Sequence, residues 1–430
     1  MIQFALLMMA ITFFGCGDDK KEPDPNPLLK GVVLDAITNT PMTGANVVVI
    51  DLESNETVGR QLTDDDGTFS FSLEEGTYTL EVQAIGYYDY PANQGGGVVV
   101  TLPADSSTLL RLNPNASLGS VGSVSGKVHL ESGSAAGTLV VAVNGDKAVS
   151  TAAGPDGTFL LLNVPAGTWT LEFYKAGLAQ TGTVAEVQVS AGKSTSVDAQ
   201  METHAGARVT GNVSFLSTTA KNVDVTMVHP ITRKAIPGLS VRTDSSNRFQ
   251  MDQVPPGTYI AWASYQNDSI VMDPDWIRKS GLPILVVLPT DTALTIDFSC
   301  TGSILLSAPT NPMDSIYPVE VDTIPSFSWV KLSSYASAQE YIIEVFNVDG
   351  KRIWGGYSDS LKPLHATIEA TTTTSIQWNF DSSATETLKP GDYRWKIYAI
   401  KVIDKKGVIT RELLSASEDL QGLFHVLEAE

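Results

Sequence analysis

The residue types that most often carry out catalysis are scattered along this chain. Neither cysteine, Cys16 or Cys300, has a partner at the spacing of a metal site, and two cysteines give no disulfide framework. No histidine pair has the i, i+4 spacing with which a helix holds zinc. The histidines are His129, His204, His229, His365 and His425. We therefore expect no catalytic residues, no metal and no cofactor, so that the protein is not an enzyme.

A run of three aspartates, Asp64, Asp65 and Asp66, precedes Gly67. Carboxylate oxygens are ligands that Ca²⁺ accepts, but the ion needs six to eight oxygens. The corresponding positions further along the chain do not carry the same acids. A solvated hairpin turn is therefore the preferred interpretation, and calcium binding stays open.

Sugar binding requires exposed aromatic faces beside polar side chains, because pyranose C–H faces stack on rings while hydroxyl groups form hydrogen bonds. Most aromatic residues here occupy strand positions and are expected in the core. The exception is a charged, proline-containing segment that we expect to be a loop. It contains Asp273, Asp275, Trp276 and Arg278. These four residues are candidate ligand contacts; the alternative is that Trp276 anchors the loop on its own module.

A second and weaker aromatic candidate lies near residue 90. It consists of Tyr87, Tyr88 and Tyr90.

The elements that position these residues come from an internal repeat, which settles architecture when its period is fixed. Asp-Gly-Thr-Phe at 66–69 recurs at 156–159, and Ser-Asn-Arg-Phe follows at 246–249. Each copy is followed by a Gly-Thr-aromatic turn, at 76–78, 167–169 and 257–259. The turn residue moves from 67 to 157 to 247, a period of 90 residues. Three homologous modules are indicated.

Within each module the pattern is that of short strands joined by tight turns. Runs such as 45–49, 138–143 and 223–228 are expected to be alternating strands, in which every second side chain lies on a core-facing surface. Glycine and asparagine tolerate the positive φ that tight hairpins need. We therefore expect an all-β fold built from tandem antiparallel β-sandwiches.

These modules resemble the carboxypeptidase regulatory-like domain, a transthyretin-like or prealbumin-like sandwich. The resemblance rests on the opening Gly-x-Val, the Asp-Gly-x-Phe turn, the Pro-x-Gly-x-Tyr/Trp turn and the tail at Gly86-Tyr87 or Ala176-Gly177-Leu178, and it covers roughly residues 28 to 299. It implies a carbohydrate-binding-like fold that serves bacterial surface proteins as a spacer or ligand-presenting module.

From about residue 303 the pattern changes. Residues 388–399, Leu-Lys-Pro-Gly-Asp-Tyr-Arg-Trp-Lys-Ile-Tyr-Ala, resemble the tyrosine corner of a fibronectin type III domain. We expect one such immunoglobulin-like sandwich here, with Trp329, Tyr393 and Trp395 in its core.

The N-terminus carries an apolar run, Ile2 to Gly15, that is too short for an ordinary membrane-spanning helix and suits the core of a secretory signal. The run ends in Phe-Phe-Gly-Cys-Gly at 13–17, which resembles the lipobox of bacterial lipoproteins, although Phe13 and Phe14 depart from its usual Leu and small residue. The resemblance implies cleavage before Cys16 and lipidation of its thiol. A cleaved secretory signal and a short buried segment are the alternatives.

The segment after Cys16 is charged and rich in proline, a composition that stays an extended tether. Acidic residues at this place resemble the surface-export signal of Bacteroidetes-type lipoproteins; the alternative is a solvated linker. Acyl chains contribute about 0.8 kcal/mol per buried CH₂, so the multiple chains of a lipoprotein would hold it at a membrane.

The overall charge narrows the choice of partners. With 28 basic and 48 acidic side chains the net charge is −20, which repels phosphate backbones. We expect no nucleic-acid partner.

These observations predict six segments and a non-catalytic role. The segments are a lipoprotein signal peptide (1–15), an acidic tether (16–27), three carboxypeptidase regulatory-like modules (28–115, 120–202 and 205–300) and a fibronectin type III-like domain (303–430). The leading hypothesis is an outer-membrane lipoprotein, on the periplasmic or the cell-surface face, that acts as a structural and interaction scaffold. The alternative is a carbohydrate-binding surface lipoprotein that captures glycans for an uptake system. Glycans or other envelope proteins are the expected partners.

Overall fold

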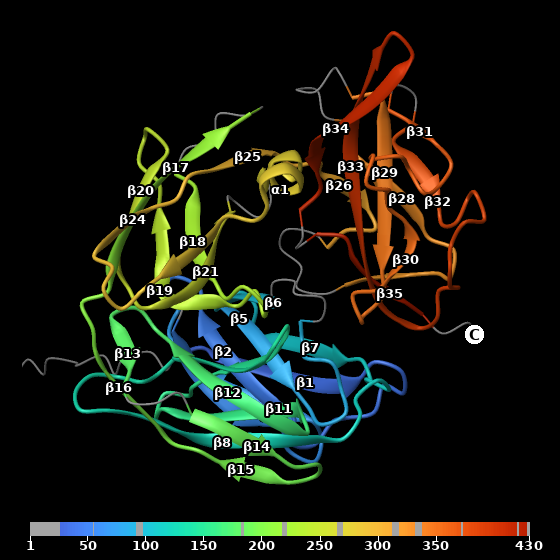
Figure 1. The fold of residues 1–430 in the computed structure, drawn as a ribbon. Helices are drawn as coiled ribbons and strands as arrows, with labels where there is room; N and C mark the ends of the chain where they lie inside the picture. Colours follow the sequence, from blue (N-terminus) through green and yellow to red (C-terminus); the bar gives the residue numbers. More distant parts are fainter. Residues whose placement is uncertain are drawn as a thin grey trace, which may run out of the picture.

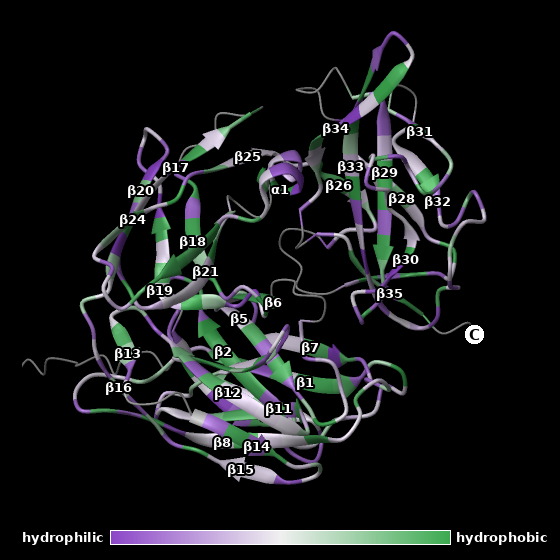
Figure 2. Cartoon of the chain, viewed as in Figure 1, coloured by the Kyte–Doolittle hydropathy of each residue, from purple (hydrophilic) through white to green (hydrophobic). Residues whose placement is uncertain are grey.

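The computed structural model confirms the all-β prediction (Figure 1). It describes residues 26–54, 56–91, 98–181, 185–216, 222–264, 270–311, 318–331, 338–370, 373–418 and 421–427. Within these ranges every element is a strand except one short helix, α1 (Pro274–Ser280). Hydrophobic residues concentrate on the strands, and most connecting segments are polar (Figure 2). The predicted signal peptide and most of the predicted tether lie outside the described residues.

The first module packs a three-stranded sheet, ordered β4-β1-β7, against a four-stranded sheet, ordered β3-β2-β5-β6. Its strands are β1 (Leu28–Asp35), β2 (Asn46–Asp51), β3 (Thr57–Leu62), β4 (Thr68–Ser72), β5 (Gly76–Gln83), β6 (Val98–Leu102) and β7 (Ser107–Leu112). The first and last strands, β1 and β7, pair in parallel, whereas the other pairs are antiparallel.

The second module repeats this arrangement, with sheets ordered β11-β8-β16-β13 and β10-β9-β12-β14. Two short strands, β15 and β16, take the place of β7 and pair in parallel with β8. The strands are β8 (Val121–Leu130), β9 (Leu139–Asn144), β10 (Lys147–Ala152), β11 (Thr158–Pro165), β12 (Gly167–Tyr174), β13 (Leu178–Gln180), β14 (Ala185–Val189), β15 (Ser194–Ser196) and β16 (Ala199–Thr203).

The third module has sheets ordered β20-β17-β25-β22 and β19-β18-β21-β23, and again β24 and β25 pair in parallel with β17. Helix α1 connects β22 to β23. The strands are β17 (Ala207–Phe215), β18 (Asp224–Val228), β19 (Ala235–Arg242), β20 (Arg248–Val254), β21 (Gly257–Ser264), β22 (Ile270–Met272), β23 (Ile284–Val287), β24 (Ala293–Thr295) and β25 (Phe298–Gly302).

The repeated sequence motifs correspond to three repeated contacts, the first of which joins a glycine to a phenylalanine across two strands. The ring of the Asp-Gly-x-Phe motif packs on a glycine of the module's first strand, where a Cβ atom would lie less than 3 Å from the ring. The cross-strand pairs are Gly31–Phe69, Gly126–Phe159 and Gly211–Phe249. Only hydrogen fits beneath these rings, which explains why the two motifs recur together.

The second repeated contact is the tight turn itself. Gly67, Gly157 and Asn247 have φ of 70°, 82° and 59°, so the predicted left-handed turn residue is confirmed in all three modules. In each case the carbonyl of this residue accepts a hydrogen bond of 2.9 Å from a valine of the first strand.

The third repeated contact holds an aromatic ring over the turn that immediately precedes it in the sequence. The ring's polar hydrogen is donated to the carbonyl oxygen four residues upstream, at 2.7 to 2.8 Å. The pairs are Tyr78 with Glu74, Trp169 with Pro165 and Tyr259 with Pro255. A buried aromatic polar group thereby finds its partner, as such groups require.

The C-terminal domain is a sandwich of a three-stranded sheet, β26-β28-β32, and a larger sheet, β27-β35-β33-β29-β30. Strands β31 and β34 extend the larger sheet by pairing with β29 and β33. The strands are β26 (Leu306–Ala308), β27 (Val319–Val321), β28 (Ser326–Trp329), β29 (Glu340–Phe346), β30 (Arg352–Gly355), β31 (Ile368–Glu369), β32 (Ser375–Gln377), β33 (Gly391–Lys405), β34 (Val408–Ala416) and β35 (Leu423–Val426).

The tyrosine corner predicted for this domain is present. The Tyr393 hydroxyl donates to the Lys389 carbonyl at 3.0 Å and accepts from the Lys389 amide at 2.9 Å. Trp329 and Trp395 lie in the core, as expected. Membership of the fibronectin type III family stays a prediction.

The modules pack around one another and do not form an extended line (Figure 1). The first module contacts the third through Glu81 and Lys234, and it contacts the C-terminal domain through Asn113 and Asp392, whose side chains lie 2.8 Å apart. The sequence could not reveal this, because the folding-back depends on contacts between residues more than 150 positions apart.

Candidate functional site

The second module docks on the first through one buried asparagine. Asn163 sits at a bulge of β11 with φ of 57°. Its Nδ2 donates to the carbonyls of Ala84 (2.7 Å) and Tyr87 (3.0 Å), and its Oδ1 accepts from the Gly86 amide (3.0 Å). The side chain therefore satisfies three backbone groups of a turn in the neighbouring module.

The third module docks on the second with the same elements. Gln253, 90 residues after Asn163, also has a left-handed backbone, with φ of 62°. Its carbonyl accepts a 2.9 Å hydrogen bond from the amide of Gly177, which corresponds to Gly86. The interface is thus repeated along with the sequence.

Charged side chains reinforce these interfaces. Lys175 of the second module lies 2.9 Å from Glu56 of the first, and Lys234 of the third lies 2.6 Å from Glu81 of the first. His229 of the third lies 3.5 Å from Glu172 of the second. Hydrogen bonding to His229 lowers the pKa of Glu172.

Asp89 adds a carboxyl group to this junction. Gln83 donates to it at 2.8 Å and also to the Ser150 carbonyl of the second module at 3.0 Å. Burial raises the pKa of Asp89 to about 6, against the opposing effects of Gln83 and Lys234; Glu81 acts in the same direction as burial. Ionisation of Asp89 is therefore less favourable in the folded protein than in the unfolded chain, although the carboxylate still predominates at pH 7.

Replacing Asp89 with asparagine is expected to stabilise the protein at pH 7 and not at pH 3. Unfolded aspartate ionises near 3.8, so between that pH and about 6 the folded state binds more protons and stability falls as pH rises. The asparagine side chain does not ionise, so it avoids this loss of stability of about 1–3 kcal/mol. Its amide oxygen can still accept the hydrogen bond from Gln83. Urea unfolding of both proteins at the two pH values checks this; an equal difference at both would contradict it.

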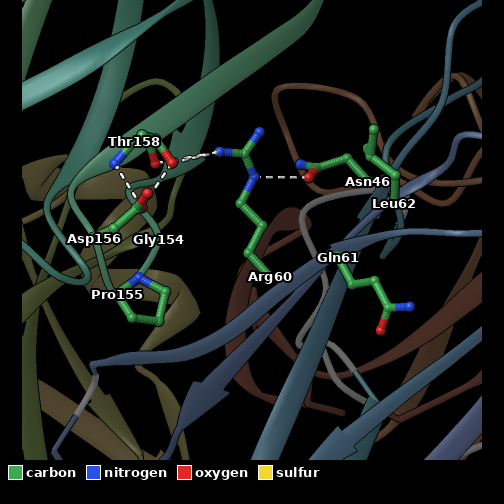
Figure 3. Close-up of a pocket in the computed structure, with 8 residues that line it drawn as sticks. All are labelled: Asn46, Arg60, Gln61, Leu62, Gly154, Pro155, Asp156 and Thr158. Carbon is green, nitrogen blue, oxygen red and sulfur yellow. Dashed lines mark hydrogen bonds between the residues drawn. The ribbon is translucent and has the colours of Figure 1, made fainter.

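A pocket opens between β3 of the first module and the β10–β11 turn of the second (Figure 3). This open pocket has a volume of about 350 Å³. The guanidinium of Arg60 bridges the two modules: Nε donates to Asn46 Oδ1 (2.9 Å) and Nη1 to the Thr158 carbonyl (3.2 Å). The lining residues are Asn46, Arg60, Gln61, Leu62, Gly154, Pro155, Asp156 and Thr158.

The charges of this pocket balance. Burial lowers the pKa of Arg60, and the nearby Asp156 carboxylate acts in the opposite direction. Hydrogen bonds from the hydroxyl and amide of Thr158 lower the pKa of Asp156, so it is ionised at neutral pH. The pocket thus holds one cation and one anion.

Sequence reasoning missed this pocket. A signal existed, because register places Arg60 at the hairpin position that Ser150 and Ser240 occupy in the other modules. An arginine at a position where the other modules have serine indicates a role that is specific to one module. The repeat alone does not show which residues the arginine contacts.

The segment around Trp276 forms helix α1 and not the expected loop. Asp273 caps the helix by accepting from the amides of Asp275 (3.0 Å) and Trp276 (3.2 Å), and Pro274 occupies its first turn. Asp275 forms ion pairs with Arg278 and Lys279. The charged candidates therefore interact with one another.

The Trp276 side chain is 37 % exposed, whereas Ile277 packs against the core of the third module. Helix α1 also lies against β34 of the C-terminal domain. The ligand role of Trp276 stays a prediction.

The three tyrosines lie at the edge of the first module. Tyr87 donates to Asp35 at 2.7 Å, and burial with this bond raises the pKa of Tyr87 to about 12. Tyr87 and Tyr90 pack against the core of the module. The Tyr88 amide donates to Asn113 at 3.0 Å. The turn they form is the one that receives Asn163.

The cysteines and acidic turn complete the predicted sites. Cys300 is buried and free, and burial raises the pKa of its thiol; Cys16 lies outside the described residues. Asp64 accepts hydrogen bonds from the amides of Asp66 and Thr68, as a turn residue does.

Within the described ranges no group of His, Cys, Asp or Glu could hold a metal ion, and no helix has the length and apolar character to cross a membrane.

Comparison with known families identifies the first two modules. Residues 29–110 and 123–202 match the carboxypeptidase regulatory-like domain. The resemblance stated for these two modules is thereby confirmed. The third module has the strand order of the second. Among curated proteins none matches this chain.

Several solved structures show distant similarity to this chain. The Bacillus anthracis TIE protein shares 13 % identity with a TM-score of 0.19, over 90 % of this chain and 67 % of that chain. A streptococcal ancillary pilin shares 12 % with a TM-score of 0.18, over 63 % and 98 %. A DUF3823 family protein from Bacteroides uniformis shares 8 % with a TM-score of 0.21, over 52 % and 100 %.

Proposed function

We propose that this protein is a non-catalytic scaffold of the bacterial outer membrane, anchored by lipid on Cys16, that presents its β-sandwich modules to other envelope components. The observation that carries the proposal is the repeated interface: Asn163 and Gln253 dock equivalent bulges onto equivalent glycine turns. The glycine amide donates to the side chain of Asn163 in one interface and to the main-chain carbonyl of Gln253 in the other, so the same two structural elements meet each time. Repetition of this meeting of bulge and turn favours a fixed angle between neighbours.

The chemistry of the interface supports rigidity. Asn163 is buried, and a small rotation that kept the interface closed would leave its amide and three backbone groups without partners. Each buried polar group left unsatisfied costs about 1–3 kcal/mol. Interfaces between domains of one chain are otherwise commonly mobile. A scaffold has to keep a fixed angle between its modules, whereas an enzyme that works by hinge motion has to let that angle change.

Replacing Asn163 with alanine is expected to loosen the first two modules from each other while each keeps its own sandwich. The radius of gyration from small-angle X-ray scattering should rise, and protease cleavage should increase in the connection at residues 113–120. Asn144→Ala is the matched control, because its exposed amide bonds only Thr168 within the same module. Identical scattering from the two variants would contradict a rigid interface.

The lipid anchor has its own test. Cys16→Ser is expected to move the protein from the membrane pellet to the soluble fraction, because the acylated thiol is the proposed attachment. Cys300→Ser is the control and should stay in the pellet, since the Cys300 thiol is buried. Retention of Cys16→Ser in the pellet would overturn the anchor and leave the rigidity result untouched.

A further inference from the structure

The pocket between the first two modules has unused hydrogen-bonding groups of both kinds. Arg60 employs Nε and Nη1 in the interface, and its Nη2 has no partner among the described residues. Asp156 uses Oδ1 for Thr158, and its Oδ2 likewise has none. A donor of the first module and an acceptor of the second therefore both line this pocket without a partner among the described residues.

Asn46 contributes a further donor at the floor of the pocket. Its side chain is fully buried, Oδ1 accepts from Arg60, and Nδ2 has no hydrogen-bond partner. Buried amide groups without partners are rare in native proteins, and each calls for an explanation such as a bound molecule or a water.

The charge balance selects against an anion. A carboxylate or phosphate would be attracted by Arg60 and repelled by Asp156, and the chain as a whole carries −20. A neutral hydroxyl group gains from both residues, because it accepts from a guanidinium and donates to a carboxylate. Two adjacent hydroxyl groups could satisfy Arg60 and Asp156 together.

Two apolar side chains complete the lining. Pro155 and Leu62, both exposed, stand beside the polar groups in the same pocket. Figure 3 shows the Gln61 side chain turned away from Asn46, and it accepts instead from the Ser70 amide. Aliphatic surface in the same pocket as a donor and an acceptor suits a ring that has C–H faces and hydroxyl edges.

We propose that this pocket binds a neutral saccharide unit through a vicinal diol, with one hydroxyl accepting from Arg60 Nη2 and the other donating to Asp156 Oδ2. The site exists only when the two modules are docked, since each module supplies one of the two groups. It lies on modules one and two, whereas Trp276 lies on the third, and the scaffold role does not depend on it.

The test is titration calorimetry and saturation-transfer NMR on the full chain with methyl glucoside, methyl mannoside and methyl galactoside, and with acetate and glucuronate as anionic probes. At least one neutral glycoside is expected to bind with millimolar affinity. Asp156→Asn and Arg60→Met should each weaken this binding at least tenfold. Asp156→Asn keeps the turn, because the amide oxygen still accepts from Thr158, so its loss of binding does not reflect unfolding.

The repeat supplies matched controls. Asp66 holds the same turn position in the first module, and Arg242 lies on the equivalent hairpin of the third; Asp66→Asn and Arg242→Met should bind as wild type. Three outcomes would overturn the proposal: no neutral glycoside binds at tens of millimolar, the anions bind and the glycosides do not, or Asp156→Asn binds undiminished. None of these affects the scattering or fractionation results expected of a scaffold.

Discussion

Gly126→Ala is expected to cost the second module about 3 kcal/mol or more of its free energy of unfolding, at the upper end of what single substitutions do. A Cβ atom at this position would lie 1.8 Å from the Val197 carbonyl oxygen and 2.9 Å from the Phe159 ring. The nearer obstacle is backbone, so no side-chain rotation relieves the overlap. The strand must instead separate from its neighbours on both sides.

Urea unfolding and hydrogen exchange of the β8 and β11 amides would measure this effect. Gly119→Ala is the matched control, because Gly119 is exposed and a Cβ there meets nothing within 4 Å. The control should unfold within about 0.5 kcal/mol of wild type, as surface substitutions usually do. If both variants unfold alike, the close contact at Gly126 does not exist in solution.

This contact shows how far sequence reasoning extends. Both halves of it, the opening glycine and the Asp-Gly-x-Phe turn, could be recognised from the 90-residue repeat, because tight turns and alternating strands leave local patterns. The contact between Gly126 and Phe159 could not be predicted, because it depends on the register between two strands about 30 positions apart. The parallel pairing of the first and last strands of each module could not be predicted from the sequence for the same reason.

Helix α1 has recognisable start and stop residues in the sequence, but the helix is too short for its periodicity to predict it. Asp273 and Pro274 form a helix start, Arg278 and Lys279 stand in the last turn, and Gly281 follows. These are recognised start and stop residues. Seven residues give fewer than two full turns of periodicity, and the charged, proline-containing composition of the segment favours a loop.

The interface residues were beyond prediction for a physical reason. Asn163, Asp89 and Arg60 act on other modules, and their roles depend on how complete sandwiches dock. Docking is decided by a few hydrogen bonds between turns, which have no periodic signature. What the sequence does offer is departure from the repeat, since a long or charged residue at a position that is small in the sister modules indicates a contact specific to one of them.

The second large effect concerns Gly157, the turn residue with φ of 82°. Gly157→Val is expected to destabilise the second module by about 2–4 kcal/mol, because a β-branched residue at positive φ is a severe outlier. A Cβ atom would also lie 2.7 Å from the Val128 carbonyl oxygen. Urea unfolding and exchange of the β8 and β11 amides measure the loss.

Gly157→Asn separates backbone strain from crowding. Asn247 takes the equivalent place in the third module with φ of 59°, and its carbonyl makes the same 2.9 Å hydrogen bond to the first strand, so asparagine is compatible with this turn. We expect Asn to cost about 1 kcal/mol, well below Val, because asparagine enters the left-handed region more readily than other residues that carry a Cβ. Equal losses from Val and Asn would mean that the Val128 contact, and not φ, limits the site; no loss from either would contradict the turn and the 90-residue register together.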